Sequence, residues 1–469
     1  MKSLAILSTS LLLSALPSTL AAPTASTELK ARWYKPEEHT GPTPSAAAVS
    51  VQAADEDPKD DYIVVMAEDE TRPWNDIFAD LGCNKTNVGK TFGTNIRAFT
   101  MSMKNSTGVR MFSMPNVAIL EKNVIYRAAV MPTGPSFKPQ TMSRELVKDS
   151  LRMSRLAKRQ SGVFIEQSTA PWGLQRVSSA DTVALDGRKD TALTFKYRFD
   201  QASGAGVDVY MLDTGINVDQ VDFGGRAQMK FSVDGTTTDA QGHGSHTAGT
   251  VGSRTFGVAK NVNLIGVKVL QDDGSGSIAG IVQGIDFVIS SHRSRSNDPE
   301  FKGSVISMSL GGDGLPQSMF NVLQKATSAG IHVSVAAGNE NQDACNTSPA
   351  GFSQQLPIIS VGATDVNDAR ASFSNFGKCV DIHAPGVDIV STFNKGPSST
   401  ATLQGTSMAC PAVSGIIADL LVSNPSLRTD PAGMKKLLLS KALNGVIRAG
   451  QNVPSGGQVL LNNGFPGNP

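Results

Sequence analysis

Several residue types that build specialised binding surfaces are scarce in this sequence. Aromatic residues make up 6% of the 469 residues, the formal net charge at pH 7 is +1, and no long run of Lys and Arg is present. A chain with neither a basic surplus nor many aromatic side chains lacks the usual means of binding nucleic acid or an acidic membrane surface. We therefore expect no nucleic-acid partner.

Cysteine is also scarce, with four residues in the chain: Cys83, Cys345, Cys379 and Cys410. None of them forms a Cys-x-x-Cys pair, which is a common element of structural zinc sites. A zinc-held fold is therefore improbable, and the four thiols remain available for disulfide formation in an oxidising compartment.

Long apolar runs are absent except at the N-terminus. A positive start at Met1-Lys2 is followed by an apolar stretch that Pro17 interrupts, and then by the small residues Ala21 and Ala22. This pattern indicates a signal peptide over residues 1–22, because the stretch is too short and broken for a membrane-spanning helix. We expect a soluble product without a membrane span, extracellular or alternatively vacuolar, with glycan acceptor triplets at Asn84, Asn105 and Asn346.

The chain is long enough for more than one folded unit. Residues 23–60 have the composition of a disordered leader, rich in Ala, Pro, Thr and acidic residues. Residues 61–127 form a pattern of mixed elements, which predicts a small α+β domain near the lower size limit for independent folding. The expected strands are Tyr62–Met66, Ile96–Met103 and Val117–Leu120, and the expected helix is Arg72–Leu81.

Residues 128–164 lose this periodicity and are expected to form a linker and processing region. The region contains three prolines and a basic run that ends at Lys158-Arg159, a candidate dibasic cleavage site. A solvated charged helix from Ser143 to Lys158 explains the same charges, and both interpretations can hold together.

Strand and helix patterns alternate over residues 165–469. Such repeats predict an α/β fold with a mostly parallel sheet covered by helices on both faces. Ligands of such sheets bind beyond the carboxyl ends of the strands. The expected strands are Val207–Leu212, Val262–Leu270, Val305–Leu310, Ile331–Ala337 and Ile358–Gly362, and the expected helices are Ile278–Val288, Pro316–Ala329 and Thr406–Val422.

Histidine is scarce as well, which narrows the search for a catalytic base. Of six histidines, His39 lies in the leader, and His292, His332 and His383 have no acid–base constellation around them in sequence. His292 is expected to be solvated and His332 to be packed in the core. The remaining two lie in Gly242-His243-Gly244-Ser245-His246, where glycines let other groups approach the backbone closely.

Ser407 and Asp213 are the matching candidates for a nucleophile and an acid. Ser407 lies at the start of an expected helix, where the helix dipole favours developing negative charge, although an ordinary helix-capping serine has the same pattern. Asp213 follows a buried strand, as many turn aspartates do. Their order, Asp213 then His243 then Ser407, is the order of the subtilisin triad and differs from the order in esterases.

The segments around these residues resemble the four signature blocks of the subtilisin-like serine proteases. Other segments, among them residues 249–260 and 372–377, resemble the fungal proteinase K-like branch, and residues 338–349 resemble its cerevisin-type members. The four blocks are Tyr210–Gly215 (YMLDTG), Gly242–Gly249 (GHGSHTAG), Ala336–Asn339 (AAGN) and Gly405–Ala409 (GTSMA).

The resemblance implies a serine endopeptidase with an Asp213–His243–Ser407 triad, in which Asn339 donates to the oxyanion and His246 is a structural neighbour. It implies two substrate-binding segments that clamp a peptide as an added strand. Small residues near the S1 pocket imply broad specificity with apolar or aromatic P1 residues. The two segments are Gly274, Ser275 and Gly276, and Ser309, Leu310 and Gly311.

The resemblance also implies a zymogen, in which residues 61–127 act as an inhibitor-type propeptide and folding aid for a monomeric enzyme. It implies a disulfide between Cys345 and Cys379, with Cys410 free. The chemistry needs no cofactor. A structural calcium ion at Asp381, with the carbonyls of Leu356 and Ile358, is a further expectation, for which a solvated strand-end aspartate is the alternative.

Two flanks depart from the family pattern. Cys410-Pro411-Ala412 follows the Ser407 block where Thr or Ser, Pro and His are usual, and Gln220-Val221-Asp222-Phe223 stands where His-Pro before an acidic residue and Phe is usual. In addition, Thr247 stands where the branch often has cysteine. The unusual flanks leave open a non-catalytic relative that only binds proteins. The other two classes weighed are an active endopeptidase and a metal-dependent hydrolase using His243 and His246. The second lacks the glutamate of a His-Glu-x-x-His base.

Overall fold

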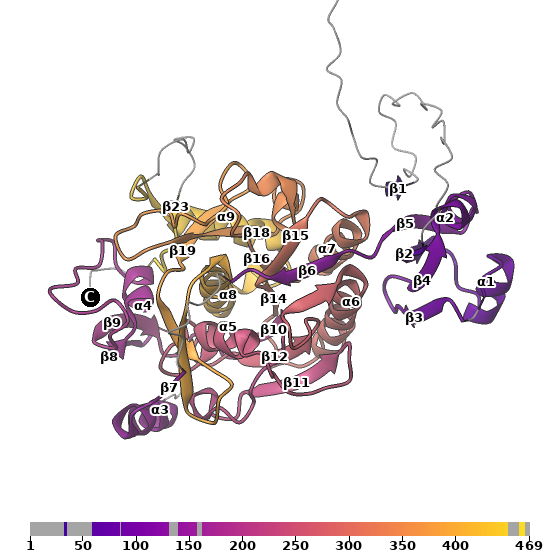
Figure 1. Cartoon of the computed structure of the whole chain (residues 1–469). Helices are drawn as coiled ribbons and strands as arrows, with labels where there is room; N and C mark the ends of the chain where they lie inside the picture. Colours follow the sequence, from indigo (N-terminus) through magenta and orange to yellow (C-terminus); the bar gives the residue numbers. More distant parts are fainter. Residues whose placement is uncertain are drawn as a thin grey trace, which may run out of the picture.

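The computed structural model describes residues 32–34, 59–84, 86–130, 139–156, 162–448 and 459–464. These residues form a small N-terminal unit and a larger C-terminal unit, joined by an extended strand that runs across the larger one (Figure 1). The expected signal peptide and the Lys158-Arg159 pair lie outside the described residues.

The N-terminal unit is one antiparallel sheet with two helices. The strand order is β1-β5-β2-β4-β3. The elements are β1 (Arg32–Tyr34), β2 (Lys59–Met66), α1 (Trp74–Asp80), β3 (Val88–Phe92), β4 (Ala98–Lys104), α2 (Asn105–Phe112) and β5 (Val117–Lys122). β1 pairs with β5, so three residues of the expected disordered leader form an edge strand.

Strand β2 explains why this sheet docks on the rest of the chain. Alternate side chains of a strand point to opposite faces. Tyr62, Val64 and Met66 pack with α1 and α2 in one core, whereas Ile63 and Val65 belong to the core that includes the helices of the larger unit. The continuous apolar run Tyr62–Met66 is therefore buried on both faces only when the two units are in contact.

Two carboxylates join the units. Asp286 of the larger unit accepts hydrogen bonds from the backbone N–H groups of Thr94 (2.9 Å), Asn95 (2.7 Å) and Ile96 (3.1 Å). Glu121 of β5 accepts from the backbone N–H groups of Gln317 and Ser318 at 2.9 and 3.0 Å, at a helix N-terminus that favours negative charge.

The C-terminal unit is built on a sheet with strand order β11-β12-β10-β14-β16-β18-β19-β23-β22. Every neighbouring pair is parallel except β22 and β23. The strands are β10 (Asp208–Asp213), β11 (Ala227–Ser232), β12 (Asn263–Lys268), β14 (Ser304–Met308), β16 (His332–Ala336), β18 (Ile359–Thr364), β19 (Ile382–Pro385), β22 (Leu443–Asn444) and β23 (Val459–Leu460).

Helices cover both faces of this sheet, which confirms the expected α/β fold. α5 and α8 pack on one face, and α6 and α7 pack on the other. The helices are α4 (Trp172–Val177), α5 (His243–Gly252), α6 (Ile278–Arg295), α7 (Gln317–Ser328), α8 (Thr406–Ser423) and α9 (Pro431–Lys441), with short 3₁₀ turns at 221–223, 344–346, 350–352 and 425–427. In the described part of the chain, α8 alone is long and apolar enough to cross a membrane, but 83% of that window is buried, as in a core helix.

Shorter strands surround the main sheet, and one of them, β6 (Ile125–Ala128), extends from the N-terminal unit onto the larger unit. β6 lies between β13 (Ser275–Ser277) and β15 (Leu310–Asp313), and β15 also pairs with β17 (Thr347–Ser348). Two smaller sheets are formed by β8 (Phe164–Ala170) with β9 (Phe195–Asp200), and by β20 (Ile389–Thr392), β21 (Ser399–Leu403) and β7 (Gln140–Thr141).

The expected linker therefore contains ordered elements. β7 pairs with β21, and α3 (Arg144–Leu156) follows it, inside the range expected for a charged helix. Met142 is buried with Phe256 and Val390 of the larger unit. The region after residue 128 is thus attached to the larger unit at β7 and at Met142.

Candidate active site

The three candidate catalytic residues lie at the ends of elements that meet at one edge of the main sheet. Asp213 is the last residue of β10, His243 the first of α5 and Ser407 the second of α8. Strand β10 is central and wholly buried, and α5 and α8 pack against each other beside it. This is the edge where ligands of parallel sheets bind.

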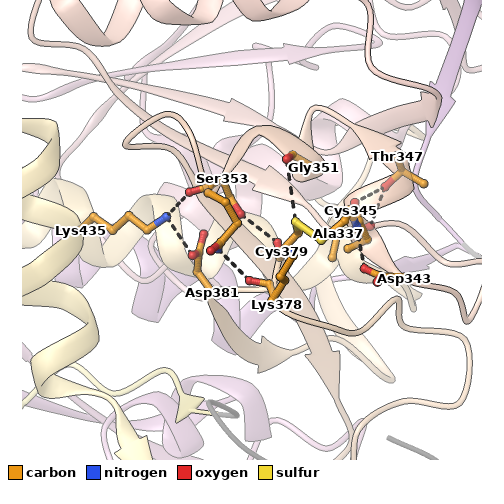
Figure 2. The surroundings of a disulfide bond; sticks show 12 residues. Ala337, Asp343, Cys345, Thr347, Gly351, Ser353, Lys378, Cys379, Asp381 and Lys435 are labelled. Carbon is orange, nitrogen blue, oxygen red and sulfur yellow. Dashed lines mark hydrogen bonds and ion pairs between the residues drawn. A yellow bond between two sulfur atoms is a disulfide. The ribbon is translucent and has the colours of Figure 1, made fainter. Parts of the chain in front are cut away.

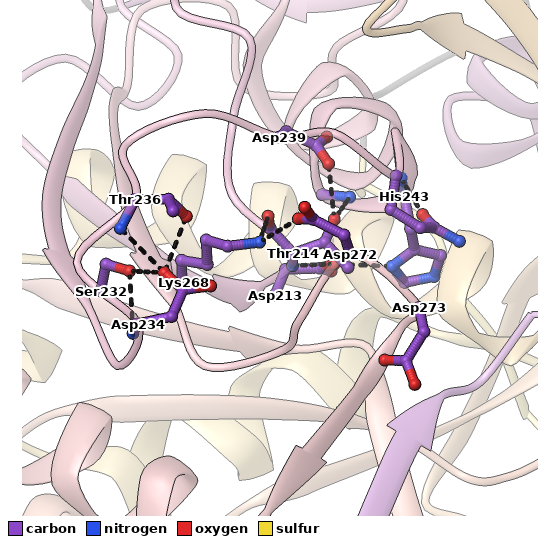
Figure 3. A network of polar contacts seen from close by, with 12 residues as sticks. Asp213, Thr214, Ser232, Asp234, Thr236, Asp239, His243, Lys268, Asp272 and Asp273 are labelled. Carbon is purple, nitrogen blue, oxygen red and sulfur yellow. Dashed lines mark hydrogen bonds and ion pairs between the residues drawn. The ribbon is translucent and has the colours of Figure 1, made fainter.

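Asp213 and His243 form a buried hydrogen-bonded pair (Figure 3). Nδ1 of His243 lies 2.7 Å from Oδ1 of Asp213, and each residue is 1% exposed. The Asp213 carboxylate also accepts from the backbone N–H of Thr214 at 2.7 Å and from the Thr247 hydroxyl at 3.1 Å. A carboxylate held in this way can fix the imidazole tautomer and stabilise an imidazolium.

The second ring nitrogen of His243, Nε2, is buried and has no hydrogen-bond partner among the described residues. The Ser407 hydroxyl donates to the backbone carbonyl of Ser309 at 2.8 Å. The hydroxyl is thus bonded to the backbone of Ser309 rather than to the imidazole of His243.

The side-chain amide of Asn339 lies next to Thr406, the residue before Ser407. Its Oδ1 atom accepts from the backbone N–H and the hydroxyl of Thr406, both at 2.9 Å. These bonds assign the orientation of the amide, and Nδ2 is buried without a partner among the residues that the structure describes. A free N–H donor in a water-poor site can stabilise a developing oxyanion.

A peptide of the chain itself occupies the space in front of these groups. The Ala129 carbonyl accepts from the backbone N–H of Ser407 at 3.1 Å. Gly405 makes this approach possible, because a Cβ atom at this position would lie 2.6 Å from the Ala129 oxygen and 3.2 Å from Asn339 Nδ2. The Ala129 peptide therefore lies directly against the start of α8.

Strand β6 holds this peptide between the two expected substrate-binding segments. Ser275 and Gly276 pair with Arg127 and Tyr126 in antiparallel register. Leu310 and Gly311 pair with Ala128 and Arg127 on the other side. The N–H groups of Ala128 and Ala129 donate to the carbonyls of Gly274 and Ser309 at 3.0 and 3.1 Å.

Tyr126, three residues before Ala129 in the chain, fills a pocket. The side chain is fully buried, and its hydroxyl hydrogen-bonds to Ser348. The ring lies against Gly312, where a Cβ atom would come within 2.6 Å of the ring. The pocket therefore depends on the absence of a side chain at Gly312 and suits a large aromatic residue.

His246 has a structural role. Its Nε2 atom lies 3.0 and 3.2 Å from the carbonyls of Ile389 and Ala401. Burial lowers the pKa of His246 to about 3. The imidazole is thus neutral near pH 7 and donates to the backbone.

Asp239, which no sequence motif identified, organises the loop before His243. Its carboxylate accepts from the Thr214 hydroxyl at 2.9 Å and from the backbone N–H groups of Gly242 and Ser245 at 2.7 and 2.9 Å. The Thr214 hydroxyl in turn accepts from the N–H of Gly244. An aspartate shortly before a helix is a typical helix-start signal, so this residue could have been found.

The prediction for one of the other histidines was wrong. His292, expected to be solvated, is 6% exposed, and its Nδ1 lies 2.9 Å from the Ser304 hydroxyl. Its helix α6 covers the sheet, so a histidine on the inward face is buried. His332 is packed in the core as expected, and His383 is also buried.

The unusual flanks of the catalytic blocks are buried. Cys410 is fully buried, lies 3.3 Å from the Ser334 hydroxyl, and burial raises the pKa of its thiol to about 11. Its thiol points towards the main sheet, where it contacts Ser334 of β16 and the Met308 carbonyl of β14. Pro411 and Ala412 are buried in the same helix.

Cys345 and Cys379 form a disulfide. Asp381, two residues further on, forms an ion pair with Lys435 at 2.8 Å, and the Ile358 carbonyl accepts from the same ammonium. Within the described residues, no group of three or more His, Cys, Asp or Glu side chains could hold a metal ion. The side chain at Asp381 is therefore neither solvated nor part of a carboxylate cluster.

The comparisons with known proteins agree with this geometry. Residues 204–464 match the subtilase family model. A subtilisin-like serine protease of Rhodotorula mucilaginosa is 43% identical over 288 residues, which cover 59% of this chain and 81% of that protein. Cerevisin of Saccharomyces cerevisiae is 43% identical over 266 residues, which cover 56% of this chain but only 40% of cerevisin.

A solved structure matches as well. The crystal structure of a cold-adapted subtilisin-like serine proteinase is 37% identical and superposes with a TM-score of 0.53. The match covers 63% of this chain and 99% of that one. The similarity thus extends over nearly the whole of the solved enzyme.

Proposed function

Because the chain belongs to the subtilase family and is a serine endopeptidase, we propose that Asp213, His243 and Ser407 are its catalytic triad. The observation that carries this proposal is the Ala129 carbonyl against the backbone N–H of Ser407, next to the buried Asp213–His243 pair. A peptide carbonyl at that position is where a nucleophile at Ser407 has to attack.

In the proposed reaction, the Ser407 hydroxyl rotates towards His243 and attacks the carbonyl carbon. The new C–O bond forms as the serine proton moves to His243 Nε2. His243 then gives the proton to the leaving amine, the C–N bond breaks, and an acyl-enzyme remains. Water then attacks the acyl carbonyl carbon while His243 takes its proton. The bond between that carbon and Ser407 Oγ breaks, His243 returns the proton to Ser407, and the acid is released.

Asp213 and Asn339 act on charge in this scheme. Asp213 stays ionised and stabilises the imidazolium that forms on His243. Asn339 Nδ2 and the Ser407 N–H donate to the oxygen that becomes negative in the tetrahedral intermediate. The support for Asn339 is its free, buried Nδ2 atom, since Thr406 already occupies its Oδ1 atom.

We further propose that the chain is made as a zymogen and first cuts itself between Ala129 and Val130. Residues 59–129 then form the inhibitory propeptide, with β6 bound as a product in the cleft. Support comes from the two-sided pairing of β6 and from the carboxylate contacts of Asp286 and Glu121 between the units. A product strand that stays bound blocks other substrates until it is itself degraded.

The substrate specificity follows from the same strand. Backbone pairing provides affinity that does not depend on the side chains of the substrate. Small residues around Ala337 and Gly338 leave room for apolar or aromatic P1 residues, and the Tyr126 site favours an aromatic residue at P4. Broad cleavage of unfolded proteins is the expected activity, with no cofactor in the chemical steps.

We propose passage through the secretory pathway. The signal-like start at residues 1–22, the disulfide and the exposed asparagines of the three glycan acceptor triplets support this route. An extracellular enzyme fits these features, and a vacuolar one fits them equally.

Activity on casein tests the proposed function. The mature enzyme should hydrolyse casein and lose this activity to a serine-directed phosphonylating reagent, with the label on Ser407. A chelator should leave the initial rate unchanged. Casein hydrolysis that survives in Ser407→Ala, or a label on another residue, would overturn the assignment.

A further inference from the structure

A lysine ammonium lies in the place where this fold was expected to hold calcium. Asp381 stands between β18 and β19, and its side chain is 6% exposed. One carboxylate oxygen accepts from the backbone N–H of Ser360 at 2.9 Å. The other lies 2.8 Å from Nζ of Lys435, which reaches in from α9 (Figure 2).

The Lys435 ammonium has a complete set of acceptors. Besides Asp381, it donates to the backbone carbonyls of Ser353 and Ile358, each at 2.8 Å. A lysine ammonium has three N–H donors, and three oxygens receive them here. The charge is therefore both paired and fully hydrogen-bonded, which a buried ammonium requires.

These oxygens do not fit a calcium ion while Lys435 is present. Calcium takes six to eight oxygen ligands at about 2.3–2.6 Å. The carboxylate and the two carbonyls already converge on one nitrogen, so an ion among them would contact an ammonium of the same charge. The Ile358 carbonyl, one of the two expected backbone ligands, is among those used by Lys435.

We propose that Lys435 acts as a built-in cation at Asp381, so that this site needs no calcium, and that removing the ammonium leaves a cation-binding site. The lysine joins α9 to the stretch between Cys345 and Cys379, whose two ends the disulfide connects. Ser353 lies in that stretch and its hydroxyl donates to the Cys379 carbonyl at 3.0 Å. The ammonium thereby links α9 to the stretch between β17 and β18, which contains Ser353 and Ile358.

The test compares thermal unfolding in excess EDTA and in excess CaCl2. The full chain carries Ser407→Ala to suppress proteolysis, and all variants are purified in CaCl2 so that a calcium-requiring variant folds before chelation. Lys435→Ala should unfold roughly 5–10 °C below the parent in EDTA, because it leaves a buried carboxylate unpaired. CaCl2 should restore much of that loss.

Three controls separate the site from general effects. Lys436→Ala removes an exposed lysine of the same helix and should match the parent in both media. Lys435→Met fills the space without a charge, so it should lose stability and gain no extra response to calcium. Asp381→Asn should leave the calcium response of the parent unchanged, whatever other calcium sites the chain has.

Two results would overturn the inference. A calcium response of the parent that disappears in Asp381→Asn would mean that calcium binds at Asp381 with Lys435 in place. A Lys435→Ala chain whose unfolding temperature responds to calcium no more than that of the parent would mean that no cation site lies under the ammonium. Terbium luminescence, stronger for Lys435→Ala than for the parent, is the independent measurement of ion binding.

Discussion

The carbonyl oxygen of Ala129 accepts a hydrogen bond from the backbone N–H of Ser407 at 3.1 Å. This contact places a peptide bond of the chain in its own proposed catalytic site. Strand β6 leads to it from the N-terminal unit, and β7 continues the chain on the far side. The same contact underlies three proposals: Ser407 is the nucleophile, β6 blocks the cleft of the zymogen, and the first cleavage follows Ala129.

Tyr126 should be the side chain that holds β6 in the cleft. Tyr126→Ala removes a fully buried aromatic ring and its hydrogen bond to Ser348. Loss of a buried aromatic side chain costs about 3–5 kcal/mol, so the cleaved propeptide should dissociate at least tenfold faster. The lag before casein hydrolysis appears should shorten accordingly.

The matched control for Tyr126 is Ile125→Ala, one residue earlier on the same strand. Ile125 is 55% exposed and should leave the lag unchanged. Equal lags for Tyr126→Ala and the parent would show that the pocket at Gly312 does not contribute to inhibition.

Asn339→Ala should lower kcat with little change in KM. The amide Nδ2 is proposed to bind the oxyanion, which exists only in the transition state and intermediate, and one such donor is worth about 10²–10³ in kcat. Gln342→Ala, in the same loop, is the control and should keep the parent rates. If Asn339→Ala lowers the free energy of unfolding by as much as it raises the activation free energy for kcat, Asn339 has a packing role instead.

Thr247 should position Asp213 through its hydroxyl, which lies 3.1 Å from the carboxylate. Thr247→Val keeps the shape but removes this hydrogen bond to a charged group, which is worth about 1.5–3 kcal/mol. We expect kcat/KM to fall about tenfold. Thr247→Ser, which keeps the hydroxyl, should restore the rate, and failure of that rescue would exclude a hydrogen-bonding role.

Stability should fall as the pH drops from about 6.5 to about 4. Burial lowers the pKa of His246 to about 3, and those of His332 and His383 to about 4. The unfolded chain binds protons at these histidines below about pH 6.5, whereas the folded chain does not, so the stability present above that pH is lost on acidification. Each histidine contributes roughly 1 kcal/mol per pH unit.

Urea unfolding of the Ser407→Ala chain between pH 4 and pH 7 measures this dependence. His383 is the best single probe, because neither ring nitrogen has a hydrogen-bond partner in the structure. His383→Leu should flatten the slope by about one proton. An unchanged slope would mean that His383 is not held neutral by burial.

Much of the fold was predictable because its strands and helices carry strong local signals. The apolar run before Asp213 predicted β10, and the spacing of Ile278, Ile281 and Ile285 predicted α6. The helix α2 and the strand β7 were not predicted. α2 is only 8 residues long, contains Gly108 and has no side-chain cap, and the two-residue β7 exists through its pairing with the distant β21.

The candidate site shows the same division. The motifs around His243 and Ser407 identify the residues expected to do the chemistry, because these residues are close to glycines and to element ends. Asp239 and Lys435 lie outside such motifs and reach their partners only through the tertiary fold. The family resemblance implied calcium at Asp381, with a solvated aspartate as the alternative. The contact with Lys435, 54 positions later in α9, could not be predicted from the sequence.

Intact-mass analysis of the N-terminal fragment released by freshly folded chain tests the central claim most directly. The account predicts a fragment that ends at Ala129 from the unchanged chain, and no such fragment from Ser407→Ala. A Ser407→Ala chain that is cut after Ala129 at the same rate, or a first cut at any other bond, would contradict it.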